Sequence, residues 1–219
     1  MIRFHEVTKR FRTHGVEKTV ADRISMTFPS GRTIGLLGRN GAGKSSLLKM
    51  VSGTMRPSEG WIEVTGSVSW PVGFAGSFHG DLTGLQNTRF VARIYGVDRD
   101  ALEAFVREFS GLGDAFTLPF RTYSQGMRAR LGFALSMGIG FDTYLVDEVT
   151  AVGDAAFRET CEAALAARLA DRGAVIVSHS LGFLRRVCDA GVVIENGQAL
   201  WFDDIEAAVE AHREFMSPA

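Results

Sequence analysis

The stretch Gly38-Arg39-Asn40-Gly41-Ala42-Gly43-Lys44-Ser45 follows an apolar run at 33–37 and precedes a helix-like segment at 46–51. It fits the phosphate-binding pattern G-x-x-x-x-G-K-[ST] between a strand and a helix. Glycines let successive backbone N–H groups point inward, and the positive end of the following helix adds attraction for anionic oxygens. In this pattern Lys44 reaches the β- and γ-phosphates, and the Ser45 hydroxyl is a ligand of Mg²⁺. The stretch therefore predicts a nucleotide-phosphate site, with an ordinary glycine-rich turn as the alternative.

Two further apolar runs end in side chains that suit phosphate chemistry. The run at 141–146 ends at Asp147 and Glu148, and the run at 174–177 ends at a loop that carries His179. In a parallel sheet buried on both faces, ligands bind beyond the carboxyl ends of the strands, where these side chains fall. Asp147 can hold Mg²⁺ through its water shell, and Glu148 can orient or deprotonate an attacking water. His179 is predicted to contact a γ-phosphate, and a surface histidine that caps the next helix is the alternative.

Length, composition and charge indicate an ordinary globular domain. The 219 residues, 46% hydrophobic and 22% charged, suit one α/β domain with a subdomain. A formal net charge of −1 provides no global basic field that would recruit nucleic acid or acidic lipid. The most apolar run, at 131–141, is well below the roughly 20 residues that cross a bilayer. Any membrane role is therefore expected to pass through a partner.

Cysteine usage and the N-terminus favour a reducing, cytosolic setting. Cys161 and Cys188 are the only cysteines and lie outside any C-x-x-C pattern, so buried and unreactive thiols are expected. Residues 1–6 lack the apolar segment of a signal peptide, and secretion is not expected.

The N-terminal third predicts a small antiparallel sheet beside the phosphate loop. Residues 2–7 alternate like an edge strand, 13–18 are expected to form a surface loop, and 24–28 a second strand. Phe11 lies on this sheet, where core packing and stacking on a base are both open. The loop at 70–80 is apolar and rich in aromatic residues and glycine. We expect it to be a docking surface, with closure of its aromatics onto the core as the alternative.

The middle of the chain has helical spacing. Thr83 can cap a helix that reaches Tyr95, and apolar residues at helical spacing continue at 97–109 and 124–138. This pattern predicts a helical subdomain at about 82–140, inserted into the α/β core.

The C-terminal third predicts a hairpin between helices. Asp154 is placed to cap one helix, and Asp203 is placed to cap the last one. Between them, residues 192–202 have the pattern of a hairpin with a two-residue Asn-Gly turn.

Together these motifs resemble the ATP-binding cassette (ABC) ATPases over nearly the whole chain. The features that occur in the family's order are the phosphate loop, the signature-like segment Tyr123-Ser124-Gln125-Gly126-Met127, the acids Asp147 and Glu148, a loop around Asp154, and His179. The signature segment departs from the common L-S-G-G-Q but keeps Ser124 and Gly126 before a helix. Its form, with the segments at 69–73 and 146–154, is similar to the ATPase subunits of bacterial capsular polysaccharide exporters. Teichoic-acid and O-antigen exporters are the first alternatives, and a soluble ABC ATPase that acts on nucleic acid or ribosomes is a further one.

The resemblance implies a fold and a set of partners. It implies an α/β P-loop NTPase fold with a RecA-like parallel core, an N-terminal antiparallel β-subdomain and an inserted helical subdomain, in one nucleotide-binding domain over 1–219. In the family, two copies sandwich two ATP molecules head to tail. The implied partners are a second copy of the chain, an integral membrane permease, and periplasmic or outer-membrane export proteins reached through that permease. The implied location is peripheral, on the cytoplasmic face of the bacterial inner membrane. Nucleic acid is not an expected partner, because no basic face or coiled-coil insertion is visible.

The resemblance also implies roles for single residues. Phe11 matches the residue that stacks on adenine, Glu148 the catalytic carboxylate and His179 the switch histidine. Ser45 and Asp147 are the expected Mg²⁺ ligands, and Lys44 is counted with the catalytic residues. The candidate ATP-binding residues are Phe11, Gly38, Arg39, Asn40, Gly41, Ala42, Gly43, Lys44, Ser45, Ser46, Ser124, Gln125, Gly126 and Asp154. The family usually has a glutamine in the loop between its subdomains, and residues 70–80 contain none. The residues nearest to its expected place are His79 in that loop and Gln86 on the following helix.

Overall fold

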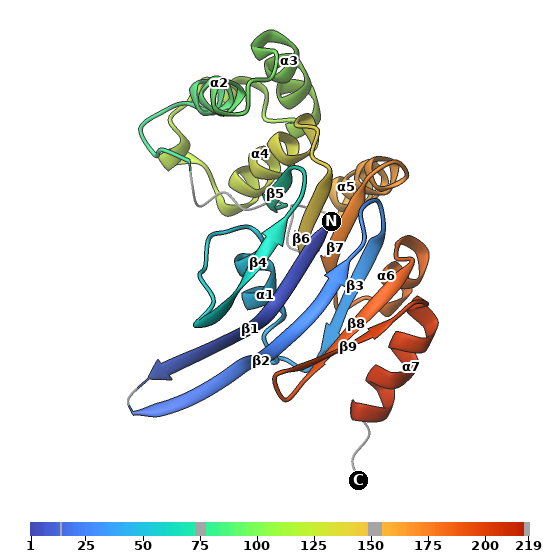
Figure 1. The fold of residues 1–219 in the computed structure, drawn as a ribbon. Helices are drawn as coiled ribbons and strands as arrows, with labels where there is room; N and C mark the ends of the chain where they lie inside the picture. Colours follow the sequence, from blue (N-terminus) through green and yellow to red (C-terminus); the bar gives the residue numbers. More distant parts are fainter. Residues whose placement is uncertain (14, 73–77, 149–154, 217–219) are drawn as a thin grey trace. The chain divides into compact units, whose positions relative to one another are not determined.

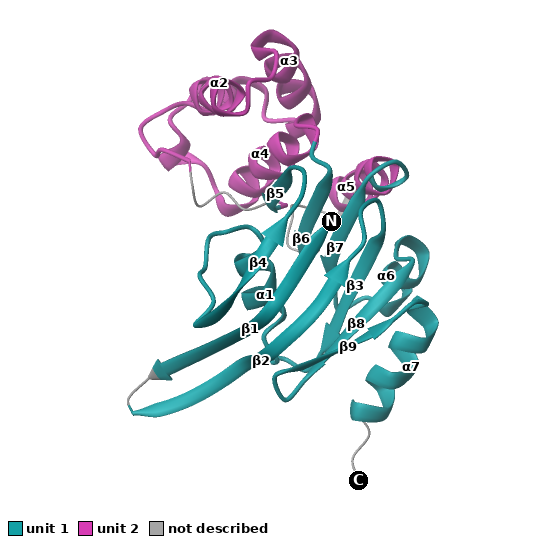
Figure 2. Ribbon diagram, viewed as in Figure 1, with its two compact units in different colours: residues 1–71, 141–148, 169–219 teal, residues 72–140, 149–168 magenta. Residues whose placement is uncertain are grey.

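The computed structural model describes residues 1–13, 15–72, 78–148 and 155–216, which form two compact units (Figure 2). The first unit comprises Met1–Pro71, Phe141–Glu148 and Leu169–Ala219, and the second comprises Val72–Gly140 and Val149–Arg168. Among the described residues, every strand belongs to the first unit, and the second is helical. The helical segment predicted at about 82–140 falls within the second unit, which also takes in 149–168.

A six-stranded sheet with the order β5-β6-β7-β3-β8-β9 forms the core of the first unit (Figure 1). Its strands are β3 (Thr33–Gly38), β5 (Val68–Pro71), β6 (Thr143–Asp147), β7 (Gly173–Val177), β8 (Ala190–Glu195) and β9 (Gln198–Phe202). Pairing is parallel except in the hairpin β8–β9, whose turn residues Asn196 and Gly197 both have positive φ, at 50° and 80°. All of β7 and most of β3 and β6 are buried. The predicted parallel core is therefore confirmed, and so is the Asn-Gly hairpin.

Three helices complete this layer: α1 (Lys44–Val51), α6 (Leu181–Val187) and α7 (Ile205–Met216). Helix α7 packs closely on β8, because a side chain at Gly191 would overlap the helix. The predicted cap of α7 at Asp203 is wrong by one residue. Asp204 accepts a hydrogen bond from the Ala207 N–H at 3.1 Å, whereas Asp203 accepts one from the Trp201 indole at 2.9 Å. The Trp201 indole and the distant Arg32 guanidinium together occupy the carboxylate that capping would have used.

A three-stranded antiparallel sheet with the order β2-β1-β4 forms the N-terminal part. Its strands are β1 (Ile2–Thr13), β2 (Val16–Phe28) and β4 (Glu59–Val64). The predicted edge strand is therefore the central one, since β4 returns from far along the chain to pair with its open side. The predicted surface loop at 13–18 is also largely wrong, because the β1–β2 ladder continues to the pair Thr13–Val16. The polar side chains of this segment give no alternating pattern from which a strand could be predicted. They do not prevent the backbone hydrogen bonds of the ladder.

One hydrophobic core joins both sheets and α1 within the first unit. It contains Phe4 and Phe28 from the antiparallel sheet, Leu36 and Val192 from the parallel sheet, and Leu48 from α1. The phosphate loop between β3 and α1 is thus anchored on both sides by buried elements.

The second unit is built from α2 (Gly84–Tyr95), α3 (Arg99–Ser110), α4 (Gln125–Gly138), α5 (Ala155–Leu169) and the 3₁₀ turns Gly113–Thr117 and Phe120–Thr122. The predicted cap at Thr83 is confirmed, because its hydroxyl accepts a hydrogen bond from the Gln86 N–H at 3.0 Å. A side chain at Gly138 would overlap Leu102, so α3 and α4 pack closely. None of the helices in the described residues combines the length and apolar character that crossing a membrane requires.

Candidate nucleotide site

The phosphate loop needs its glycines for two separate physical reasons. Gly38, Gly41 and Gly43 have φ values of 147°, 76° and 110°, which favour glycine. In addition, a Cβ on Gly43 would lie 2.7 Å from the Val20 carbonyl oxygen, and one on Gly38 would overlap the Ile194 carbonyl oxygen. Only bare backbone fits here, and bare backbone leaves the amides free to face a ligand.

A pocket of about 410 Å³ opens beside this loop. Its lining residues are Val20, Asn40, Gly41, Gly43, Lys44, Ser45, Ser46, Glu148, Val177 and His179. The Lys44 ammonium donates hydrogen bonds to the carbonyl oxygens of Gly38 at 2.6 Å and Arg39 at 3.0 Å. Burial lowers the pKa of Lys44, and the nearby carboxylates of Glu148 and Asp147 oppose that shift. The pocket therefore combines loop backbone, a partly desolvated cation and an acidic edge.

Ser45, which lines the pocket, is hydrogen-bonded to Asp147. The Ser45 hydroxyl, in the first turn of α1, donates to Asp147 Oδ1 at 3.2 Å at the carboxyl end of β6. A hydroxyl and a carboxylate are a suitable protein share for Mg²⁺, which keeps waters and phosphate oxygens as its remaining ligands. No group of three or more His, Cys, Asp and Glu side chains in the described residues could hold a metal ion. The pair thus fits an ion bound jointly with a phosphate.

Glu148 and His179 both line the pocket and are in direct contact with each other. Glu148 Oε1 lies 2.8 Å from His179 Nε2, and the Glu148 N–H donates to the Val177 carbonyl oxygen at 3.0 Å. Glu148 has φ 52°, an unfavourable left-handed conformation for a residue of this type. Ser180, not His179, caps α6, since its hydroxyl accepts from Phe183 N–H at 3.2 Å. The helix-capping alternative for His179 is therefore excluded.

The signature segment, residues 123–127, belongs to the second unit. Tyr123 is buried, and its hydroxyl donates to the Ala115 carbonyl oxygen at 2.7 Å. Ser124 caps α4 by accepting from Met127 N–H at 3.2 Å. A Cβ on Gly126 would meet only the Ser124 hydroxyl, at 4.0 Å. Packing within the chain therefore does not require glycine at 126, while the exposed Ser124 and Gln125 leave this helix start open to a ligand.

Phe11 is not a core residue. Its side chain is 37% exposed, and the Lys9 ammonium lies 5.1 Å from the ring centroid. The core-packing alternative is thereby excluded, and base stacking stays a prediction.

Two other sequence predictions have partial outcomes. Trp70 packs edge-on against Phe141, with ring centroids 5.5 Å apart, and Phe78 packs against Phe120 at 5.4 Å. At both ends of the 70–80 loop the aromatics therefore close onto their own units. Residues 73–77 of that loop and the candidate Asp154 lie outside the described residues.

Local hydrogen bonds involve both residues that could replace the missing loop glutamine, Gln86 and His79. The Gln86 amide oxygen accepts from Thr83 N–H at 2.9 Å, which commits this side chain to the α2 capping box. The exposed His79 accepts a hydrogen bond from Asp81 N–H at 3.3 Å through Nδ1. Both side chains thus accept hydrogen bonds from backbone N–H groups just before α2.

His212 was not predicted as part of any site. It continues the buried stripe Ile205, Ala208 and Val209 of α7 and lines a second pocket, of about 140 Å³, with Lys44 among others. Its Nδ1 is buried and lacks a hydrogen-bond partner among the described residues. The helical spacing of the stripe was the available clue.

Comparisons with known proteins show the family to which the chain belongs. The family model described as ABC transporter matches residues 21–151. The ATP-binding protein BexA of Haemophilus influenzae is 46% identical over 98% of this chain and 99% of its own length. This chain belongs to the ABC transporter family. The capsule polysaccharide export ATP-binding protein CtrD of Neisseria meningitidis serogroup B is also 46% identical to this ABC protein, over 96% of this chain and 97% of CtrD.

More distant similarity extends to other exporters and to the fold itself. The O-antigen export protein RfbB of Klebsiella pneumoniae is 35% identical to this ABC protein over 89% of the chain and 80% of RfbB. A dimeric ATP-binding cassette, MJ0796, bound to ADP and Pi, superposes with a TM-score of 0.76 at 17% identity, covering 90% of this chain and 96% of that one. The predicted ABC ATPase fold is confirmed by this likeness.

Proposed function

We propose that this ABC protein is the ATP-hydrolysing subunit of a transporter that exports a capsular, or closely related lipid-linked, polysaccharide across the bacterial inner membrane. The observation that carries the ATPase assignment is the Glu148–His179 pair, at 2.8 Å, on the pocket that Lys44 lines. The polysaccharide assignment is supported by the high identity to CtrD, which exceeds that to the O-antigen protein RfbB.

The chain's own side chains suggest a division of labour in hydrolysis. Glu148 would accept the proton of the attacking water, and His179, held at its carboxylate, would contact the γ-phosphate. Lys44 would exchange its loop carbonyls for the β- and γ-phosphate oxygens. Ser45 and Asp147 would hold Mg²⁺, which when bound neutralises charge on the phosphate oxygens. Phe11 would stack on the adenine ring.

A second copy of the chain would complete the site. Ser124, Gln125 and Gly126 begin a helix whose first N–H groups can bind phosphate oxygens. The open space at Gly126 supports an approach by an outside ligand rather than by this chain. A head-to-tail pair would bring this segment to the partner's nucleotide.

The permease is the proposed membrane partner, and export proteins beyond the inner membrane would be reached through it. Phe90 and Ile94 lie one helical turn apart on α2 and are 55% and 59% exposed. Such an apolar stripe on an otherwise folded helix suits contact with another protein. In this arrangement the chain lies peripherally on the cytoplasmic face of the inner membrane.

The test is the Glu148→Gln variant, assayed for ATP binding, ATP hydrolysis and export. Loss of a general base is expected to slow hydrolysis roughly 10²- to 10⁴-fold while ATP binding persists. Glu210→Gln removes the same charge from the exposed side of α7 and should leave hydrolysis unchanged. In a strain that relies on this exporter, Glu148→Gln should retain capsular polysaccharide inside the cell. Near-normal turnover would refute the ATPase assignment, and retention of O-antigen or teichoic acid instead would refute the capsular one.

A further inference from the structure

Strand β2 carries a lysine to the outer bend of the phosphate loop. The Lys18 ammonium nitrogen lies 3.3 Å from the position that a Cβ on Gly41 would occupy. Gly41 itself has φ 76° and lines the nucleotide pocket. The missing side chain at 41 therefore leaves room for the cation of another strand to lie against the loop.

Lys18 shares a strand face with Phe11, the candidate base-stacking residue. Lys18 pairs directly with Phe11 across the β1–β2 ladder, and paired residues project to the same side of an antiparallel sheet. The ladder changes register at Val20, which has no partner in it, yet Val20 lines the pocket and its Cβ lies 3.0 Å from the position of a Cβ on Gly43. The hairpin thus presents an aromatic ring and an ammonium group on one face, and places both Lys18 and Val20 against the loop.

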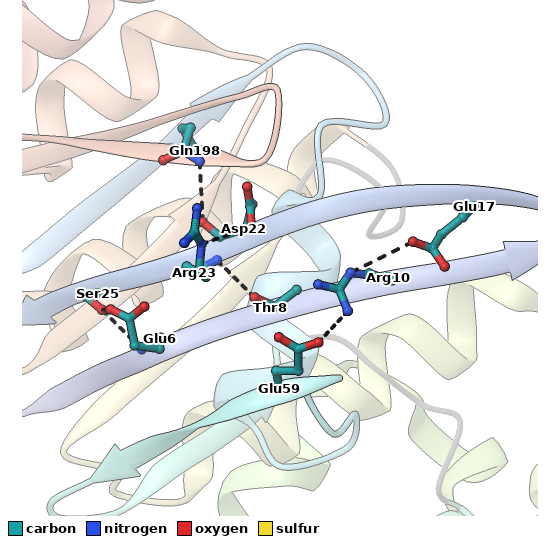
Figure 3. A network of polar contacts seen from close by, with 9 residues as sticks. All are labelled: Glu6, Thr8, Arg10, Glu17, Asp22, Arg23, Ser25, Glu59 and Gln198. Atoms are coloured by element: carbon teal, nitrogen blue, oxygen red, sulfur yellow. Dashed lines mark hydrogen bonds and ion pairs between the residues drawn. The ribbon is translucent and has the colours of Figure 1, made fainter.

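The charge of Lys18 is not neutralised by the acids of its own hairpin. Figure 3 shows that Glu17 pairs with Arg10, which also contacts Glu59, and that Asp22 lies in the same network as Arg23. Lys18 is exposed and has no ion pair within the described part of the chain. An exposed, unpaired cation beside inward-facing loop amides attracts an anion.

We propose that Lys18 is a second cationic contact for the nucleotide, on the α- and β-phosphates. Phosphate loops cradle the α- and β-phosphates with backbone amides, while Lys44 serves the β- and γ-phosphates. Lys18 lies against Gly41 of this loop, on the strand face that also carries Phe11. Triphosphate charge is then shared between one lysine from α1 and one from the antiparallel sheet. This inference rests on the nucleotide site of the proposed function.

The position of Lys18 predicts how its loss divides between binding and turnover. ATP and ADP both carry the α- and β-phosphates, so removal of the Lys18 ammonium should weaken the binding of both nucleotides by the same factor. Loss of a contact that is equally strong before and during the reaction raises KM and leaves kcat little affected. Loss of a charge-assisted hydrogen bond predicts an effect of about tenfold.

The test compares Lys18→Gln with Arg12→Gln by calorimetric titration with MgATP and MgADP and by steady-state hydrolysis. Arg12 is also exposed and lies next to Phe11 in the strand, on the opposite face. Arg12→Gln removes the same positive charge and is the matched control. Lys18→Gln should weaken the binding of ATP and ADP about tenfold and raise the KM for ATP. Lys18→Arg should restore both the affinities and the KM. Arg12→Gln should keep affinities and KM within twofold of wild type.

Three outcomes would overturn the proposal: unchanged affinity in Lys18→Gln, an equal loss in Arg12→Gln, or a loss for ATP alone. Each leaves nucleotide binding by the wild-type chain intact. Failure of the wild-type chain to bind MgATP would instead refute the proposed function itself.

Discussion

The left-handed backbone of Glu148 predicts that the carboxylate proposed as general base costs stability. Its φ of 52° is one that β-carbon-bearing residues rarely adopt, whereas asparagine is several-fold enriched there. The Glu148→Asn and Glu148→Gln variants both remove the charge and the general base. Only Glu148→Asn also relaxes the backbone, so the difference between the two variants isolates strain at this residue.

The magnitude follows from two opposing effects. A left-handed conformation costs a residue of this type about 1–2 kcal/mol, of which asparagine recovers roughly 1 kcal/mol. Glutamine can keep the 2.8 Å contact with His179, whereas asparagine is one methylene too short. That contact is worth little, because the Glu148 and His179 side chains are 45% and 61% exposed. Glu148→Asn should therefore be more stable than Glu148→Gln by about 0.5–1 kcal/mol.

Urea unfolding at neutral pH, with equal slopes for the two variants, measures this difference directly. In thermal unfolding it corresponds to a midpoint about 1–4 °C higher for Glu148→Asn, given the size of the chain. Both variants should hydrolyse ATP roughly 10²- to 10⁴-fold more slowly than wild type. If Glu148→Asn is as stable as Glu148→Gln, or less so, the backbone at 148 stores no strain and the reasoning is wrong.

Two further predictions concern buried groups. Burial raises the pKa of the Cys161 and Cys188 thiols to about 12, so neither should react with a thiol reagent at pH 8 in the folded protein, and both should react in urea; a rapid reaction in the native state would contradict this. Burial, followed by the charge of Lys44, lowers the pKa of His212 below its usual 6.5, while Glu195 opposes the shift. The unfolded chain therefore binds this proton first, and stability should fall as the pH drops below about 6.5. Urea unfolding at pH 7.5 and 5.5 should show a smaller loss in His212→Leu than in wild type, and equal losses would contradict the assignment.

Local chemistry was predicted well at two positions where one short segment contains both partners. The capping hydroxyl of Thr83 and the two-residue turn at Asn196-Gly197 each depend on residues no more than three positions apart. Such contacts form in most contexts, because the chain needs no distant surface to make them.

Predictions failed where a distant segment competes for a group. The Asp203 carboxylate accepts hydrogen bonds from Arg32, 171 positions away, as well as from the nearby Trp201 indole, and the cap falls on Asp204. Similarly, β1 became the central strand only because β4 pairs with its second edge. Nothing in the alternation of residues 2–7 could reveal that pairing.

By itself the sequence determined the phosphate loop and the acids at the end of β6, because the loop's backbone angles admit only glycine and parallel strands deliver their carboxyl ends to one edge. Only the tertiary structure decided that Glu148 meets His179 and that Lys18 lies against Gly41. Strand pairing and core packing join segments more than twenty residues apart, and no local pattern encodes the distances between them.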